Sequence, residues 1–371
     1  MDGANGYEFS NREEEDKDAG DPVQPLIPAL QQKRRKLILH LDLNNTILVS
    51  DTATGQGLRQ ALNSYLSTVA WGQIGSTGEW EWISDQPSVK PPTQEAINYY
   101  TQFGRDGSFS DSKMGRGFKE VFTRHMELLR WPGKADELFT QRGEDGKLYH
   151  WILPSFFHLL STLHQQGRPF SIILRTFGND LPNVLQSVHA ALAGKHPQFP
   201  QLLELPLTVE LTPGKIRCNK RETVLTRGTT RVSTKGEERN IYDYFNAMSG
   251  IGGFQDHFDW WKRNDFTNSG GKPLWIDPND RDNLHIIIDD NIRLSENETD
   301  TIVNSRVLLD SGKGKASRNA PTSELYDICL VQTDLLRAIA EKDYFLDCVR
   351  VCEANYETYF QKSLLRRLSY G

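Results

Sequence analysis

The stretch "LILHLDLNNTILVS", residues 37–50, decides the fold of this chain. Most of its first residues are apolar and favour β-structure. Apolar side chains occur at both odd and even positions, which is typical of a strand buried on both faces of a sheet. Asp42 follows at the point where that strand should end. Ligands of open parallel sheets bind in the crevice outside the carboxyl ends of the strands. The stretch therefore predicts an α/β fold with Asp42 at its functional edge.

Two later stretches repeat this arrangement. "FSIILRTFG" (170–178) is an apolar strand that ends at Thr176, and "LHIIIDDN" (284–291) is an apolar strand that ends at Asp289 and Asp290. Because the carboxyl ends of parallel strands meet at one edge of a sheet, we expect these residues to lie near Asp42.

Two helices are predicted around the second of these strands. Pro154 starts an amphipathic segment that stops at Gly167, and Asp180 is positioned to cap a segment that stops at Gly194. Helix, strand and helix with short connections are typical of α/β folds, which favours a parallel sheet flanked by helices.

The aspartates at these strand ends indicate metal-dependent chemistry. Mg²⁺ prefers oxygen ligands and bridges readily to a substrate phosphate, so aspartates at adjacent strand ends predict a Mg²⁺ site. An aspartate in such a site can attack phosphorus and form an aspartyl-phosphate.

Composition limits the classes of partner. The chain has 371 residues and a formal net charge of −6, which argues against a general nucleic-acid or anionic-membrane binder. No stretch approaches the roughly 20 apolar residues of a membrane helix, and the acidic start has no apolar core of a secretory signal. Four cysteines without clustering favour a reducing, cytoplasmic setting. Composition therefore favours small molecules or proteins as partners, the predicted Mg²⁺ site favours a small phosphorylated substrate among them, and the sequence leaves the oligomeric state open.

The pattern along the chain predicts five regions. They are a disordered acidic tail at 1–30, a core at 31–50 and 149–321, an inserted cap at 51–148, a smaller insertion at about 200–250, and C-terminal helices at 322–371. Within the cap, the Trp-rich segment 71–82 and the helix-like segment 117–131 are expected to close over the crevice. "GIGGF" at 250–254 lacks the spacing of a dinucleotide-binding fingerprint and is predicted to be a loop.

The ordered motifs resemble those of the haloacid dehalogenase superfamily of phosphatases and phosphotransferases. The first family motif, D-x-D-x-T, is matched at Asp42 and Thr46 but has Asn44 in place of the second aspartate. Thr176 matches the second motif, and Asp289 with Asp290 matches the fourth. The resemblance implies a Rossmann-like parallel sheet with an inserted cap and a magnesium-dependent hydrolase or transferase activity.

The resemblance also assigns roles to residues. Asp42, Asn44, Thr176 and Lys272 are the expected catalytic residues. Phosphate contacts are expected from Thr46, Arg175, Thr176 and Lys272. The Mg²⁺ ligands are expected to be Asp42, Asn44 through its backbone carbonyl, Asp289 and Asp290, with Asp290 favoured over Asp289 as the direct ligand. Lys262 is the alternative to Lys272 as the motif lysine.

Asn44 leaves more than one function open. In hydrolytic family members, the aspartate at this position protonates the leaving oxygen and then activates water, and an amide does neither. Loss of a general acid or base costs about 10² to 10⁴ in rate. The sequence therefore predicts a phosphatase or phosphotransferase that acts through Asp42 and, as the alternative, a weak or inactive pseudoenzyme that binds a phosphorylated ligand or a protein partner.

Overall fold

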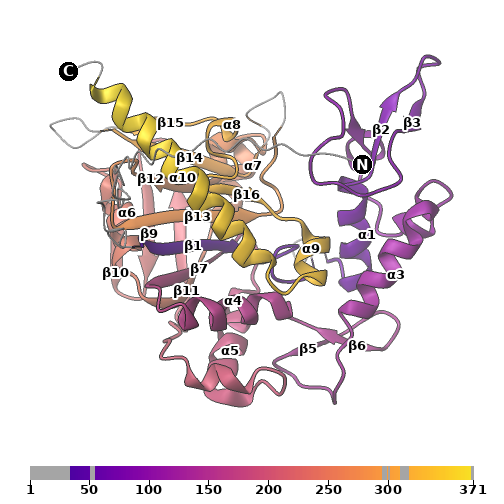
Figure 1. The fold of residues 1–371 in the computed structure, drawn as a ribbon, viewed down its shortest axis with the longest axis horizontal. Helices are drawn as coiled ribbons and strands as arrows, with labels where there is room; N and C mark the ends of the chain where they lie inside the picture. Colours follow the sequence, from indigo (N-terminus) through magenta and orange to yellow (C-terminus); the bar gives the residue numbers. More distant parts are fainter. Residues whose placement is uncertain (1–33, 51–54, 295–298, 300, 310–316, 369–371) are drawn as a thin grey trace, which may run out of the picture. The chain divides into compact units, whose positions relative to one another are not determined.

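The strand β1 (Lys36–Asp42) lies inside an eight-stranded sheet, between β7 (Phe170–Thr176) and β13 (Asn283–Asp289) (Figure 1). The computed structural model describes residues 34–50, 55–294, 299, 301–309 and 317–368, with side chains described up to residue 362. Both neighbours of β1 run parallel to it. The register places Asp42 opposite Arg175 and Leu41 opposite Ile288, so the three strands end at the same edge.

β1 is buried on both faces, as its sequence predicts. Leu37, Leu39 and Leu41 point into the larger hydrophobic core, whereas Ile38 belongs to a smaller core on the other side. The alternation of side chains along a strand explains this division, because successive residues face opposite sides of the sheet.

The sheet is mixed but mostly parallel. The strand order is β10-β9-β8-β11-β7-β1-β13-β16, in which β8, β9 and β10 pair antiparallel at one edge and the remaining pairs are parallel. The other strands of this sheet are β8 (Gly214–Cys218), β9 (Thr223–Arg227), β10 (Thr230–Ser233), β11 (Gly250–Gln255) and β16 (Leu330–Gln332). A second sheet contains β12 (Lys272–Ile276), β14 (Val303–Leu308) and β15 (Ser317–Asn319). The predicted α/β class is confirmed at this level.

Helices flank the main sheet, and the two predicted around β7 are present. They are α4 (Pro154–Gln165) and α5 (Leu181–Ala190), with Asp180 at the N-cap position of α5. The other helices outside the region 55–148 are α6 (Arg239–Ala247), α7 (Phe258–Arg263), α8 (Thr322–Leu325), α9 (Leu335–Ala340) and α10 (Tyr344–Leu368). Short helical turns occupy Ala191–Lys195, Pro200–Glu204 and Asn268–Gly270. Helix α5 contacts β7 and β11, and α4 contacts α10.

One prediction from the sequence is wrong, because "GIGGF" is a buried strand, β11, rather than a loop. The glycines of β11 explain the error, because they provide no apolar side chains for a pattern to detect, and a Cβ atom at Gly253 would lie 2.4 Å from Leu181 of α5. The polar stretches at 200–250 contain β8, β9 and β10 at the edge of the main sheet, and the C-terminal region contains the edge strand β16 as well as helices.

The region from residue 55 to residue 148 is mostly turns, small sheets and helices. Its elements are α1 (Leu58–Thr68), β2 (Trp71–Ile74), β3 (Trp80–Trp82), β4 (Ile97–Asn98), α2 (Tyr99–Phe103), turns at Phe109–Asp111 and Gly115–Phe118, α3 (Lys119–Leu128) and β5 (Thr140–Arg142), followed by β6 (Leu148–His150). Its apolar residues join the larger core of the main sheet. Tyr65 of α1 binds the chain after β16, donating to the Thr333 carbonyl at 3.1 Å and accepting from the Leu335 amide at 2.9 Å.

Across the described part of the chain, no helix combines the length and the apolar character needed to cross a membrane. The predicted acidic tail at 1–30 lies outside the described residues.

Candidate functional site

The chain turns sharply after Asp42. The Asn45 amide donates to the Leu48 carbonyl at 2.7 Å, and the Leu48 amide donates to the Leu43 carbonyl at 2.9 Å. Asn45 has a φ of 55°, a left-handed conformation that asparagine adopts more readily than most residues. This turn sends the chain back toward Ile152, to which Leu48 is bridged, and leaves Asp42 at the end of the sheet.

Lys272 binds two of the aspartates. Its Nζ atom lies 2.5 Å from Asp42 Oδ1 and 2.7 Å from Asp289 Oδ2. All three side chains are almost fully buried. Lys272 is the first residue of β12. A strand of the second sheet therefore places this ammonium group at the carboxyl ends of the strands of the main sheet. The alternative, Lys262, is an exposed residue of α7.

The paired acids Asp289 and Asp290 have different surroundings. Both carboxylate oxygens of Asp289 are engaged, one by Lys272 and the other by the Asn291 amide at 2.9 Å. Asp290 is only partly buried and lines a cavity together with Asp42. Asp290 and Asp42 are therefore the acids that face the cavity, and Asp289 holds the lysine.

The three carboxylates lie close enough to share a cation. Oxygen atoms of Asp42, Asp289 and Asp290 lie within 4.8 Å of one another. Against these three carboxyl groups the cluster has one hydrogen-bonded ammonium group within the described residues, that of Lys272, so the acids outnumber this cation three to one.

The pKa values of the cluster reflect this imbalance. Burial raises the pKa of Asp42 to about 7, with Lys272 opposing the shift. Burial and the neighbouring charges of Asp289 and Asp42 raise the pKa of Asp290. Burial alone would lower the pKa of Lys272, but Asp289 and Asp42 hold it above its ordinary value. A divalent cation would favour the ionised carboxylates and reverse the first two shifts.

The residues present fit Mg²⁺. Asp42 and Asp290 offer the carboxylate oxygens that this ion prefers. The side-chain oxygen Oδ1 of Asn44 is buried and has no hydrogen-bond partner among the described residues, so it is an acceptor in need of a donor or an ion.

The cavity above Asp42 has a volume of about 470 Å³. Its polar lining includes Asp42, Asn44, Thr176, Lys272 and Asp290. The hydroxyl of Thr176 accepts a hydrogen bond from the Gly178 amide at 2.9 Å, which leaves its own proton for a ligand. The structure thus brings five of the sequence-predicted site residues together around one space.

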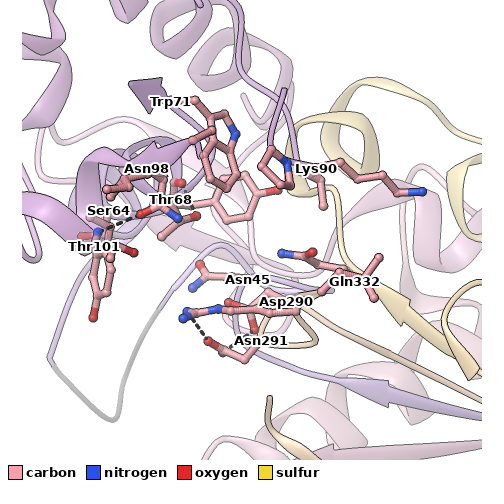
Figure 2. A pocket seen from close by; sticks show the side chains of 18 of the residues that line it. Asn45, Ser64, Thr68, Trp71, Lys90, Asn98, Thr101, Asp290, Asn291 and Gln332 are labelled. Carbon is pink, nitrogen blue, oxygen red and sulfur yellow. Dashed lines mark hydrogen bonds between the residues drawn. The ribbon is translucent and has the colours of Figure 1, made fainter. Parts of the chain in front are cut away.

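A second cavity, of about 630 Å³, adjoins the first. Six residues line both: Asn45, Tyr100, Arg105, Asp290, Asn291 and Arg293. Figure 2 shows Asn45, Asp290 and Asn291 on one side of the second cavity, and Trp71, Ser64 and Thr68 across from them. Residues of the region 55–148 therefore line both cavities. Trp71 belongs to the predicted closing segment 71–82, whereas α3, in the other predicted segment, packs against α1 and α9.

Two predicted phosphate ligands lie outside the cavity lining. The guanidinium group of Arg175 is fully buried and pairs with Asp256 through bonds of 2.8 and 2.6 Å, because Arg175 points to the opposite face of β7 from Thr176. Thr46 is also buried, and its hydroxyl lies 2.9 Å from that of Thr333. Neither side chain lines the cavity and each has a structural partner, so the structure does not place either of them at the predicted phosphate position.

The sequence pattern did not identify several residues near the site. Tyr100 and Arg105 come from the region 55–148, which has no motif, and Arg293 follows the acidic pair. Asp256 follows the buried strand β11 and had a detectable signal, since it is another acid at a strand end. A strand assignment for "GIGGF" would have found it.

The chain was compared with models of protein families, with curated proteins and with solved structures, and none of the three comparisons found a match. The residues and their geometry alone carry the functional argument.

Proposed function

We propose that the chain is a Mg²⁺-dependent phosphoryl-transfer enzyme of the haloacid dehalogenase type, which acts on a small phosphorylated substrate through an aspartyl-phosphate on Asp42. One observation carries the proposal. A buried carboxyl group, paired with a lysine at 2.5 Å, lies at the wall of a cavity in a cluster of three aspartates and one lysine. Perturbed titratable groups in a cavity are a mark of functional sites.

Three polar residues of the cavity, Asp42, Lys272 and Thr176, have tasks in the transfer itself. An oxygen of Asp42 attacks phosphorus, and the bond from phosphorus to the leaving oxygen breaks. Lys272 balances the charge of Asp42 and of the incoming phosphate. Thr176 donates its hydroxyl proton to a phosphate oxygen, because its oxygen already accepts from Gly178. These groups act by position and charge, which is the main protein contribution to phosphoryl transfer.

Asp42, Asp290 and Asn44 would hold the metal. When bound, Mg²⁺ supplies positive charge to the phosphate oxygens. Asp289 would keep Lys272 in place from behind, since both of its oxygens are already engaged. Residues of the region 55–148, including Tyr100 and Arg105, would act as a cap that limits access of water to the reacting atoms.

Formation of an acyl phosphate tests the proposal directly. The purified chain is incubated with Mg²⁺ and acetyl phosphate, and its intact mass is measured. We expect one added phosphoryl group that hydroxylamine removes, and we expect Asp42→Asn to abolish the adduct. Asp334→Asn is the matched control, because Asp334 caps α9 and asparagine is an equally good cap. An adduct that persists in Asp42→Asn, or a wild type without any adduct, would contradict the proposal.

A binding module without turnover is the second candidate, and Asn44 is the observation that favours it. The amide cannot act as the acid or base of hydrolysis. A panel of phosphorylated metabolites separates the two functions. Mg²⁺-dependent binding without an adduct and without release of phosphate would assign the site to binding alone.

A further inference from the structure

An aromatic wall forms one side of the cavity that contains Asp42. Its members are Phe177, Phe258, Trp261 and Phe266, all of which line that cavity. The rings of Phe177 and Trp261 are stacked, with centroids 5.0 Å apart and planes inclined by 9°. Phe266 contacts Trp261 edge to face at 5.1 Å, and Phe258 lies 5.9 Å from Phe177. The rings thus form one continuous surface that the proposed phosphoryl transfer does not use.

Part of this wall is open to solvent. Phe258 and Phe266 are 41% and 47% exposed. Phe266 and the residue before it, Asp265, have φ values of 57° and 54°, a left-handed conformation that aspartate tolerates but that is unfavourable for phenylalanine. Strained backbone that keeps an aromatic ring exposed in a cavity is a feature that folding alone does not favour, and such strain is found at ligand sites.

The wall begins where the phosphate would bind. Phe177 follows Thr176 directly, and the centroid of its ring lies 5.3 Å from Lys272 Nζ. The same Nζ atom lies 2.5 Å from Asp42 Oδ1. A substrate whose phosphoryl group sits between these residues therefore has its next atoms beside the rings.

The chemistry of Asn44 leads to the same kind of substrate independently. Without an acid at this position, the leaving oxygen must depart as an anion. A phenol has a pKa near ~10 and leaves as an anion far more easily than an aliphatic alcohol, which holds its proton more tightly. The site is therefore suited to leaving groups that need no proton.

From these two observations we propose that the substrate of this site is an aryl phosphate ester, whose ring packs on the aromatic wall while its phosphoryl group lies between Asp42, Lys272 and Thr176. The inference rests on the proposed phosphoryl transfer at Asp42. A carboxylate oxygen of Asp42 forms a bond to phosphorus, and the bond between phosphorus and the phenolic oxygen breaks with its electron pair on that oxygen. The phenolate then takes a proton from solvent, and water later releases inorganic phosphate from Asp42.

Binding of matched phosphonates tests the wall without requiring turnover. Phenylphosphonate and cyclohexylphosphonate have the same charge and similar size, but only the first has an aromatic ring. With Mg²⁺ present, we expect calorimetry of the wild type to give about 2- to 12-fold tighter binding of phenylphosphonate, the range that corresponds to one aromatic contact. We expect Trp261→Leu to abolish the preference. Trp260→Leu is the matched control, since it changes the preceding tryptophan of α7, which lies outside the cavity lining, and it should keep the preference.

Three results would overturn the inference. Equal binding of the two phosphonates by the wild type would show that the wall does not select aromatic rings. A preference that survives in Trp261→Leu would place the selection elsewhere. Tighter binding of adenosine monophosphate than of phenylphosphonate, lost in Trp261→Leu, would assign the wall to a nucleobase.

The same measurements keep the two proposals apart. An adduct on Asp42 from acetyl phosphate, which has no ring, together with equal phosphonate affinities would refute the aryl substrate and retain the phosphoryl transfer. Tighter binding of phenylphosphonate without any adduct on Asp42 would refute the phosphoryl transfer and retain the aromatic wall as a binding surface for the ring. Free phosphotyrosine and a phosphotyrosyl peptide distinguish the sources of the aryl phosphate, because tighter binding of the peptide supports a protein substrate and equal binding supports a small molecule.

Discussion

Two buried charge clusters lie at the carboxyl ends of neighbouring strands, and they differ in charge balance. In the first, Lys272 faces Asp42 and Asp289 at the wall of a cavity. In the second, Arg175 and Asp256 form a two-bond ion pair, and both are almost fully buried. The second pair is neutral overall and lies outside the cavity lining. A buried charge by itself therefore does not distinguish the proposed site, whereas a cluster beside a cavity in which acids outnumber the bonded cation does.

The largest expected effect concerns the balanced pair. Asp256→Ala leaves the Arg175 guanidinium buried without its partner, and loss of one member of a buried ion pair costs about 3–5 kcal/mol of the free energy of unfolding. Urea unfolding measures this value. Asp290→Ala, measured without Mg²⁺, is the counterpart, because it removes an acid that has no bonded cation in the described part of the chain and should cost much less. Similar losses in the two variants would remove the distinction between the clusters.

The next effect concerns catalysis in the unbalanced cluster. Asn44→Asp adds the missing acid, so hydrolysis should accelerate by about 10²-fold. The gain should be larger for cyclohexyl phosphate than for phenyl phosphate, because the poorer leaving group depends more on a proton. Steady-state release of phosphate gives both rates. Asn45→Asp, the same change one residue further along the cavity lining, is the matched control. Equal acceleration by both variants would point to a general charge effect.

A smaller effect is expected from the metal. Mg²⁺ that binds the folded state stabilises it by RT ln(1 + [L]/Kd), which is about 1.4 kcal/mol at ten times Kd. The melting temperature should therefore rise with Mg²⁺ in the wild type and stay constant in Asp290→Ala. Asp347→Ala removes an exposed acid of α10 and should keep the response. A full Mg²⁺ response in Asp290→Ala would place the ion at another site.

The last effect depends on pH and comes from histidines linked to the balanced pair. Arg175 Nη1 donates to His40 Nδ1 at 3.3 Å, His40 Nε2 lies 3.2 Å from His285 Nδ1, and His285 Nε2 lies 2.7 Å from Asn246 Oδ1. The amide oxygen requires a proton on Nε2 of His285, so His40 donates to its Nδ1 and both rings are neutral. Burial lowers the pKa of His285 to about 3, with Asp280 opposing the shift and Lys36 adding to it.

The hydrogen bonds of these histidines predict that the folded protein loses stability in acid. The unfolded state binds a proton at His285 below a pH of about 6.5, whereas the folded state does not until about pH 3. The free energy of unfolding should therefore fall as pH is lowered through this window, by at most about 1.4 kcal/mol per pH unit for one histidine. His285→Gln keeps a donor for Asn246 and should reduce the slope in urea titrations. An unchanged slope would mean that His285 is protonated in the folded state.

Sequence periodicity alone predicted the strand ends correctly, because the signal for a buried strand is local. Asp42, Thr176 and the acidic pair each follow an apolar run, and strands of a parallel sheet end together. The same reasoning failed at β11, whose glycines pack closely against α5 and have no apolar pattern of their own. It also failed for the cavity residues of the region 55–148. Tyr100 and Arg105 follow no strand of the main sheet, and only the tertiary structure brings them to the cavity.

The tertiary structure decided which of the candidate side chains face one another. Arg175 and Thr176 are neighbours in sequence, but one pairs with Asp256 and the other faces the cavity. Asp289 and Asp290 are neighbours too, but Asp289 is buried against Lys272 from another sheet, whereas Asp290 lines the cavity. The physical reason is that sequence specifies which residues come to a sheet edge, whereas charge partners and cavity walls are contributed by segments distant along the chain.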